Sequence, residues 1–143
     1  DHRDLHKEYR RQRQMCIRDS SDADAVCHAV TDAVLGAVAA GDIGQHFPDT
    51  DPQWKDVSSI ELLCKAVAIV SGLGFRVGNI DVVVIAEQPR IGPHVRVMKE
   101  RLSGSLGISS SLISIKGKTA EGMDSVGRGD AIAVHAVATV VQR

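Results

Sequence analysis

The stretch FRVGNIDVVVIA, residues 75–86, decides how this sequence folds. Its residues are mostly apolar and β-branched, and they run almost without a polar interruption. A short apolar run between two turn-forming segments, here SGLG and EQPRIGPH, is typical of a strand that is buried on both faces. The stretch therefore predicts a buried strand, which other segments of the chain have to cover.

The segments around this strand alternate between helical and extended patterns. Ser58 and Glu61 form a capping box ahead of apolar residues at helical spacing, and residues 94–104 show a weaker helical pattern. Further strands are expected at 112–116 and 131–142. This alternation predicts an α/β (α+β) fold, a mixed sheet with helices on one face.

Another helix is expected over residues 22–40, and Gly41 ends it. Its two opposite stripes are an apolar one, Val26, Val30, Ala33 and Ala37, and a polar one, Asp24, His28 and Asp32. The polar stripe is either part of a metal or substrate site, or a solvated face with ordinary helix pairings. The spacing alone leaves both readings open.

The segment 131–142 is apolar on both faces of the expected strand. Val134 and Ala136 would lie on one face, and Ala133 and Val137 on the other. Because helices cover only one face of the sheet, the other face must be buried against something else. We expect it to be buried by another subunit.

The composition suits one domain of ordinary size. The 143 residues are 43% hydrophobic, and the formal net charge of −1 provides no general field for nucleic acid or an anionic membrane. The sequence has no apolar run long enough to cross a bilayer and no signal-peptide pattern. Three cysteines without framework spacing indicate a reducing compartment, and we expect Cys27 and Cys64 to be buried thiols.

Residues 1–20 are dense in charge and have no apolar period, as in a disordered basic arm. The run MCIRDS, residues 15–20, is also what the DNA ATG TGT ATA AGA GAC AG plus one base encodes. That DNA resembles the end sequence of transposase-based sequencing libraries. We therefore interpret residues 1–20 as a non-native or disordered leader and residues 21–143 as the single domain.

Two loops carry polar groups. The segment 41–54 is rich in Gly, Pro and Asp, and its acids are either turn formers or groups that hold sugar hydroxyls or a hydrated cation. Lys118 and Thr119 follow Gly117, but a P-loop would need a glycine at Leu112. The segment is therefore interpreted as a turn that follows a strand. The backbone N–H groups and the Lys or Thr side chains of this turn could hold a phosphate, and Arg128 could contact the same phosphate.

In chain order, these segments resemble the family of 2-C-methyl-D-erythritol 2,4-cyclodiphosphate synthases of the non-mevalonate isoprenoid pathway, over residues 21–143. The most specific part is SDADAVCHAVTDAVLGAVAAGDIGQHFPDTD, residues 21–51. It is similar to the family's H-S-D-x-D-x-x-x-H-x-x-x-D-A-x-L-G-A...G-D-I-G-x-x-F-P-D-T-D. The supporting parts are an A-x-x-P-[KR] loop, here Ala86, Pro89 and Arg90, and a terminal K-x-x-T-x-E...G-R-G, here residues 116–129.

The resemblance implies a phosphorus–oxygen lyase that closes the substrate's 2-phosphate onto its own β-phosphate and expels CMP. It implies a zinc ion at His28, a Mg²⁺ or Mn²⁺ ion on the diphosphate at Glu121, and Thr119 as the catalytic residue that stabilises the transition state. The implied substrate-binding residues are Asp32, Asp42, Ile43, Gly44, Phe47, Pro48, Asp49, Thr50, Asp51 and Arg128. The implied cytidine-binding residues are Ala86, Pro89, Arg90 and Ile91. The family is a homotrimer with sites between subunits, in the cytoplasm or, for a plant or alga, the plastid.

The family's other two zinc ligands form an Asp-x-His ahead of a strand, and residues 21–143 contain no counterpart of that segment. Asp4-Leu5-His6 has the right letters but lacks the flanking glycines and the strand, so we interpret it as a chance match. Ser20 stands where the family has a histidine that acts on the phosphates. We therefore expect a domain that is incomplete at its N-terminus, binds zinc poorly and is weak or inactive until such a segment is restored.

Two other functions remain open at this point. The first is a non-catalytic trimeric module that binds a nucleotide or an isoprenoid diphosphate. The second is a metal-dependent phosphohydrolase that uses the same acids to activate water. The expected partners are a small nucleotide-linked substrate and further copies of the chain, with neither nucleic acid nor membrane.

Overall fold

The computed structural model describes residues 21–86, 91–119 and 132–143, so the expected leader lies outside the described residues. The longer elements are α2 (Ser21–Ala37), α4 (Ser59–Gly72), α5 (Val95–Leu106), β1 (Phe75–Ile85), β2 (Ile113–Lys118) and β3 (Ala133–Gln142). The short helical turns are α3 (Ile43–His46), η2 (Pro52–Trp54), η3 (Gly92–His94) and η4 (Ser110–Leu112). The expected helices and strands are confirmed, with ends that differ by a few residues.

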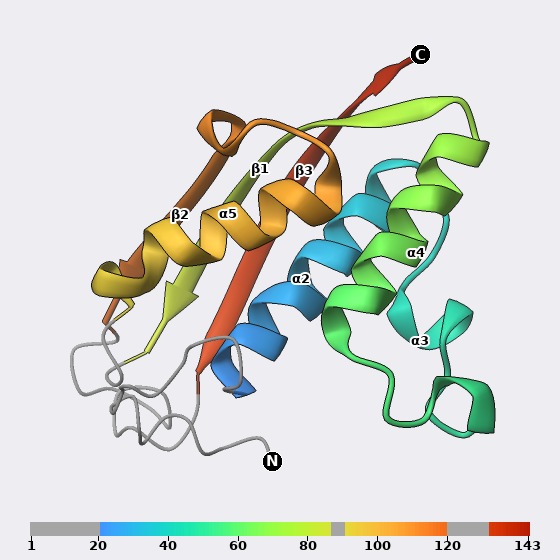
Figure 1. Cartoon of the computed structure of the whole chain (residues 1–143), viewed down its shortest axis with the longest axis horizontal. Coiled ribbons are helices and arrows are strands. Elements are labelled where there is room, and N and C mark those ends of the chain that lie inside the picture. The colour runs from blue at the N-terminus through green and yellow to red at the C-terminus, as the bar shows by residue number, and fades with distance from the viewer. Residues whose placement is uncertain (1–20, 87–90, 120–131) are drawn as a thin grey trace.

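The predicted strand is β1, and it lies at the centre of the sheet, in the order β2-β1-β3 (Figure 1). Only the face of β1 toward the helices is fully buried in the described chain, since the residues that alternate with Val82 and Val84 are partly exposed. It runs parallel to β2 and antiparallel to β3, which confirms a mixed sheet. Ile80 illustrates the register, because it pairs with Ile113 on one side and with Ala138 on the other. The parallel pair requires a crossover, and α5 supplies it between β1 and β2.

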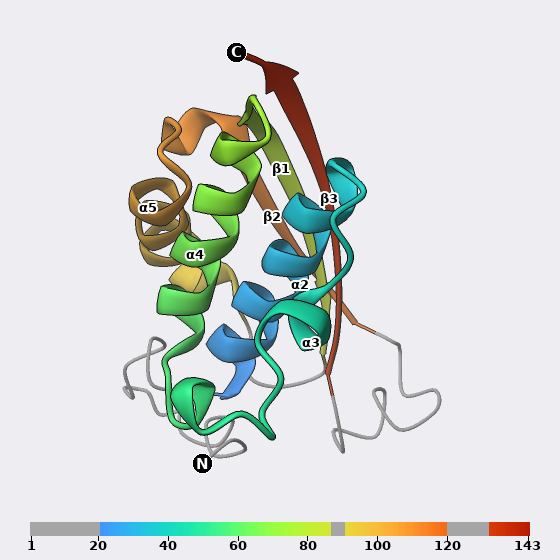
Figure 2. The same ribbon diagram turned by 90° about the vertical axis from the view of Figure 1, so that its right-hand side faces the viewer.

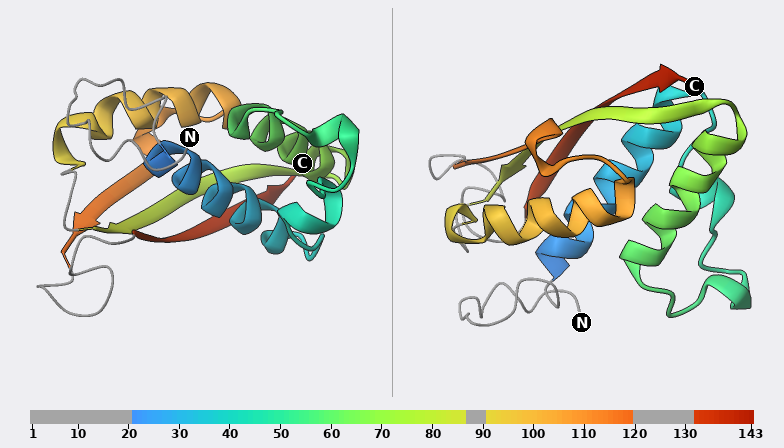
Figure 3. Two further views of the ribbon diagram at one scale, coloured as in Figure 1. Left: turned by 90° about the horizontal axis from the view of Figure 1, so that it is seen from below. Right: turned by 45° about the horizontal axis from the view of Figure 1, so that its top comes forward.

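Helices α2, α4 and α5 all lie on one side of the sheet, as Figure 2 shows with the sheet seen nearly edge-on. The views in Figure 3 agree with this one-layer arrangement. Val82 and Val84 of β1 are buried under the helices, whereas Val137 of β3 has 66% of its surface exposed. Within the described part of the chain, no helix covers the second face of the sheet.

Helix α2 buries a different stripe from the one expected. Val26 and Val30 are buried as predicted, but the stripe continues through Val34 and Leu35, and Ala37 is exposed. The larger side chains fill the space over the sheet, and Ala37 is the last helical residue. The apolar stripe was therefore predicted correctly in its first half and wrongly in its second.

Two further expectations need correction. The segment 41–54 is not only loop, because it contains the four-residue helix α3 and the turn η2. Cys64 is exposed, although Cys27 is buried as expected. Helix α4 buries Leu63 and Ala66 instead, and this turns the Cys64 side chain away from the core.

A glycine sets the pairing of β1 with β3. The register shifts between Val77 and Asn79, and a Cβ on Gly78 would lie 2.7 Å from Thr139 Oγ1. The same hydroxyl accepts a 3.0 Å hydrogen bond from the Asn79 backbone N–H and donates to Asn79 Oδ1 at 2.5 Å. A side chain at position 78 would displace this contact, so the bulge requires glycine.

Candidate functional site

The three polar residues of the α2 stripe have different surroundings. Asp24 Oδ1 accepts a hydrogen bond of 2.5 Å from Ser59 Oγ, which joins the first turns of α2 and α4. Asp32 Oδ1 accepts a 2.7 Å hydrogen bond from the Ile43 backbone N–H at the start of α3. His28 lies exposed between them and has no hydrogen bond or ion pair with a described residue. Two of the three groups are thus engaged, and His28 is available to a ligand.

The short helix α3 is fixed by its own cap as well as by Asp32. Asp42 Oδ1 accepts from the Gln45 backbone N–H, and the Gln45 side chain accepts from the Asp42 backbone N–H in return. Gly41 has a φ of +91°, and a Cβ there would lie 1.9 Å from Gln45 Oε1. Gly41 therefore adopts the left-handed conformation that the turn between α2 and α3 requires. Its missing side chain also leaves room for the Gln45 side chain of the capping box.

The segment after α3 presents polar groups to solvent. Phe47 is buried, Pro48 is half-buried, and Asp49 and Thr50 are exposed. Asp51 caps the turn η2 through a 3.0 Å hydrogen bond from the Gln53 backbone N–H to its carboxylate. The structure thus brings Asp32 of α2 together with Asp42 and Ile43 at the start of α3, and the exposed Asp49 and Thr50 follow this short helix in the chain.

Of the predicted cytidine residues, the structure describes Ala86 and Ile91, near the carboxyl ends of β1 and β2. Ala86 follows β1, and its backbone N–H donates to the Lys118 carbonyl at 3.0 Å. Thr119 is exposed just after β2, and Ile91 is buried, with its side chain close to Gly117. Of the remaining predicted residues, Pro89, Arg90, Glu121 and Arg128 lie outside the described residues.

The two groups of predicted residues are apart within one chain. Helix α3 and the carboxyl ends of β1 and β2 lie on opposite sides of the molecule in Figures 1 and 3. The first group holds the acids Asp32, Asp42 and Asp49, and the second holds the ends of parallel strands, where ligands of α/β proteins often bind. A ligand that contacted both groups within a single chain would have to span the helix layer.

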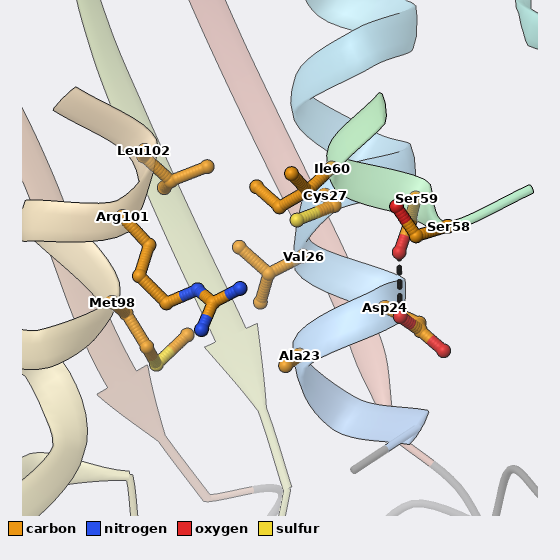
Figure 4. A pocket seen from close by; sticks show the side chains of 10 residues that line it. All are labelled: Ala23, Asp24, Val26, Cys27, Ser58, Ser59, Ile60, Met98, Arg101 and Leu102. Atoms are coloured by element: carbon orange, nitrogen blue, oxygen red, sulfur yellow. Dashed lines mark hydrogen bonds between the residues drawn. The ribbon is translucent and has the colours of Figure 1, made fainter. Parts of the chain in front are cut away.

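A separate cavity of about 260 Å³ lies between α2, α4 and α5 (Figure 4). Its lining residues are Ala23, Asp24, Val26, Cys27, Ser58, Ser59, Ile60, Met98, Arg101 and Leu102. Figure 4 shows the Arg101 side chain reaching from α5 toward α2 across this space. None of the predicted site residues lines the cavity, so it is distinct from the predicted site.

Burial lowers the reactivity of Cys27, which lies beside the cavity. Burial, together with the nearby charge of Asp24, raises the pKa of the Cys27 thiol from 9.0 to about 11, and Arg101 opposes the shift. A thiol with such a pKa is almost entirely protonated near pH 7, which disfavours nucleophilic attack by its sulfur. Cys27 is therefore a structural residue.

The described residues do not fit a metal ion by themselves. No group of three His, Cys, Asp or Glu side chains in the described ranges lies close enough to hold one. His28 offers one nitrogen, whereas a zinc site usually has three or four protein ligands. We therefore assign no step of the chemistry to a metal held by this part of the chain.

Several residues of this surface were not found from the sequence. Beside it, the hydrogen bond of Ser59 to Asp24 has no signal in the spacing of either helix. Gln45 completes the cap of α3, and Trp54 packs against Phe47. The signal for Trp54 was its presence, with Phe47, as one of two large aromatic residues in a Gly/Pro/Asp-rich loop.

The fold and the surface together define a small α/β domain whose helix layer carries an acidic loop, with one sheet face uncovered. The comparisons identify the particular family. The chain belongs to the YgbB family, whose model matches residues 10–141. The match begins inside the segment 1–20, which we interpreted as a leader.

Two curated relatives show the extent of the similarity. The bifunctional enzyme IspD/IspF of Novosphingobium aromaticivorans is 54% identical over 121 residues, which are 85% of this chain and 31% of that protein. The 2-C-methyl-D-erythritol 2,4-cyclodiphosphate synthase of Gloeobacter violaceus is 51% identical, over 82% of this chain and 72% of that protein. The chain thus spans about a third of the length of the bifunctional relative.

Solved structures are also similar to this chain. The bifunctional IspDF of Campylobacter jejuni matches with a TM-score of 0.80 at 34% identity, over 83% of this chain and 32% of that one. The CDP complex of IspF from Plasmodium falciparum matches with a TM-score of 0.71 at 30% identity, over 82% of this chain and 70% of that one. The fold of the described part is therefore shared with these enzymes.

The described part of the chain contains no helix that is long and apolar enough to span a membrane.

Proposed function

We propose that this chain carries the cyclodiphosphate synthase activity for which its relatives are named. It converts 4-diphosphocytidyl-2-C-methyl-D-erythritol 2-phosphate to 2-C-methyl-D-erythritol 2,4-cyclodiphosphate and CMP. An oxygen of the 2-phosphate attacks the β-phosphorus and forms the new P–O bond. The bond from that phosphorus to the bridging oxygen breaks, and CMP leaves with the electron pair.

One observation supports this proposal most directly. The 2.7 Å hydrogen bond from the Ile43 backbone N–H to Asp32 joins the two halves of the motif in residues 21–51. Asp42 caps α3 at the same place, so Asp32, Asp42 and the segment 47–51 form one surface next to His28. The family motif is thus a single folded surface, although its parts are separated in the sequence.

The acids of this surface suit the hydroxyl groups of the substrate. A carboxylate repels a phosphate at short range but accepts hydrogen bonds from hydroxyls. Asp32 and Asp42 each use one oxygen to fix α3 and keep the other oxygen for a ligand. We infer that they bind the methylerythritol part, and that exposed Asp49 and Thr50 bind it from the facing segment.

The phosphates need other partners. Thr119 lies at the carboxyl end of β2, and its hydroxyl is a donor suited to a phosphate oxygen in the transition state. Arg128 and Glu121, which follow in the sequence, are proposed as a phosphate contact and as a ligand of Mg²⁺ or Mn²⁺. A zinc ion at His28 would neutralise phosphate charge, but it would need ligands beyond the described residues.

A homotrimer would bring the two separate groups of residues together. The uncovered sheet face exposes Val137 and Val141 of β3, which are large apolar residues that another subunit could bury. The acidic surface and the strand ends are apart within one chain, so a site between neighbouring subunits would place one group against the other. In this arrangement, each chain would contribute one half of each binding site.

The experiment that tests the function is a product analysis with the N-terminal segment of the Gloeobacter violaceus relative placed ahead of Ser21, because the chain by itself is expected to bind zinc poorly and to be weak or inactive. The substrate is incubated with this fusion, Zn²⁺ and Mg²⁺, and the products are followed by ³¹P NMR. We expect CMP and the cyclic diphosphate in equal amounts. Release of inorganic phosphate would indicate a phosphohydrolase instead, and CMP binding without product would indicate a binding module.

A further inference from the structure

Three side chains connect the segment after α3 to helix α4. The rings of Phe47 and Trp54 meet edge to face, with centroids 4.9 Å apart and planes at 75°. Lys65 of α4 places its Nζ 5.6 Å from the centroid of the Trp54 ring. Both are favourable geometries for an aromatic pair and for a cation–π contact. We call Phe47, Trp54 and Lys65 the Trp54 anchor.

Hydrogen bonds do not provide this connection. Among the described residues, each hydrogen bond made by residues 48–57 stays within that segment, as from the Asp51 N–H to Pro48 and from the Trp54 N–H to Asp51. These bonds set the local turns of the segment and do not join it to α4. The orientation of the segment relative to α4 therefore depends on side-chain packing at Trp54.

The anchor holds the two ends of the exposed acidic stretch. Phe47 is buried at one end, and the half-buried Trp54 lies at the other. Asp49 and Thr50 lie exposed between them and have no side-chain hydrogen bond with a described residue. Fixing both ends restricts where these polar groups can point, and this lowers the entropy lost when a ligand orders them.

We propose that Trp54, held between Phe47 and Lys65, is a positioning residue that orients residues 47–51 for the substrate. The inference rests on the proposed function, because it assumes that this stretch binds the methylerythritol part. Lys65 acts through Trp54 and touches no substrate. The anchor thus improves substrate binding without taking part in the chemical step.

The chain contains a single tryptophan, so its fluorescence reports on the anchor directly. Acrylamide quenching is compared in the full chain and in the variants K65M, K65R and K99M, without any substrate. K65R keeps a cation over the ring, and K99M removes a lysine from α5 that makes no ion pair with a described residue. We expect the quenching constant to rise about twofold in K65M and to stay unchanged in K65R and K99M.

Turnover tests the role of the anchor in substrate binding. In the fusion with the restored N-terminal segment, we expect K65M to raise KM about two- to fivefold, the range of an exposed cation–π contact, with kcat within a factor of two. W54A should raise KM about tenfold, and W54F, which keeps an aromatic ring against Phe47, should recover most of the loss. Because W54A removes a half-buried ring and could unfold the segment, K65M is the decisive variant.

The outcomes separate this inference from the proposed function. Equal quenching in the wild type and K65M would show that Lys65 does not hold the ring, and it would overturn the inference. Increased quenching with an unchanged KM would also overturn it, because the segment would then be held for some other reason. If the fusion with the restored N-terminal segment yields neither CMP nor the cyclic product, the proposed function fails, and the quenching comparison alone decides whether the anchor exists.

Discussion

The carboxylate of Asp32 holds the backbone of Ile43, eleven residues further along the chain, through a hydrogen bond of 2.7 Å. The bond links the middle of α2 to the first residue of α3, where the backbone N–H has no partner within the helix. A carboxylate suits this position because it accepts a charge-assisted hydrogen bond and lies at the positive end of the short helix. A residue expected only to bind substrate therefore also builds the surface that binds it.

Replacing Asp32 tests this structural role. We expect D32A to lower the free energy of unfolding by about 1 kcal/mol, because the bond lies at an exposed site. It should also raise hydrogen exchange at the Ile43 amide. D32N should lose less stability, since the asparagine oxygen can still accept from the same N–H.

The matched control is D49A, which removes an exposed acid with no hydrogen bond to a described side chain. Urea unfolding and amide exchange measure the two effects. If D32A left the exchange of the Ile43 amide unchanged, the hydrogen bond would not hold α3 in solution.

The two described cysteines should react at very different rates. Burial raises the pKa of Cys27 to about 11, so roughly one thiol in a thousand is ionised at pH 8, whereas Cys64 is exposed. We expect iodoacetamide to label Cys64 at least a hundred times faster than Cys27, as measured by peptide mass spectrometry. Similar rates at the two positions would show that the cavity next to Cys27 is open to the reagent.

The raised pKa also predicts how stability changes with pH. Between pH 9.0 and about 11, the folded state keeps the Cys27 proton that the unfolded state loses. The folded state thus binds more protons in this window, so stability falls as the pH rises through it. We expect the C27A variant to show a smaller loss of stability between pH 9 and 11 than the wild type in urea unfolding. An equal loss in both would assign the effect to other groups.

The sequence predicted the elements well and the contacts between them poorly. The β-branched run 75–86 and the signal at Ser58 are local, and they were confirmed as β1 and as the start of α4. Of the predicted capping box, the structure has the half in which Ser58 Oγ accepts from the Glu61 backbone N–H at 3.2 Å. The bond between Asp24 and Ser59 and that between Asp32 and Ile43 depend on how the helices pack, which periodicity does not determine. Cys64 was wrongly placed in the core for the same reason, since apolar spacing on a helix leaves its rotation uncertain.

The zinc content of the purified chain tests whether His28 binds the ion weakly without further ligands. The described residues supply His28 alone, so we expect the purified chain to hold well below one zinc ion per chain by inductively coupled plasma mass spectrometry. Placing the N-terminal segment of the Gloeobacter violaceus relative ahead of Ser21 should raise the content toward one zinc ion per chain. H28A in that fusion should lower it again. Stoichiometric zinc in the original chain, insensitive to H28A, would contradict the assignment of His28 as a ligand.

A substitution on the uncovered face of the sheet tests the proposed trimer. Val137 has 66% of its surface exposed and lies directly opposite Asp81 in the register of β1 and β3. V137E would add a charge to a face that must become dry in an oligomer, and it would place this charge across from a second carboxylate. We expect light scattering to give three times the mass of one chain for the wild type and one chain mass for V137E. V137T, which keeps the shape of the side chain, should remain trimeric.

The change at Val137 should leave the monomer folded, because the side chain is already exposed within one chain. Circular dichroism should therefore match the wild type, while turnover should fall at least tenfold if the site lies between subunits. A V137E chain that stays trimeric would mean that this face is not the interface. A V137E monomer with full activity would mean that the acidic surface and the strand ends of one chain form a complete site, and the proposal of shared sites would be wrong.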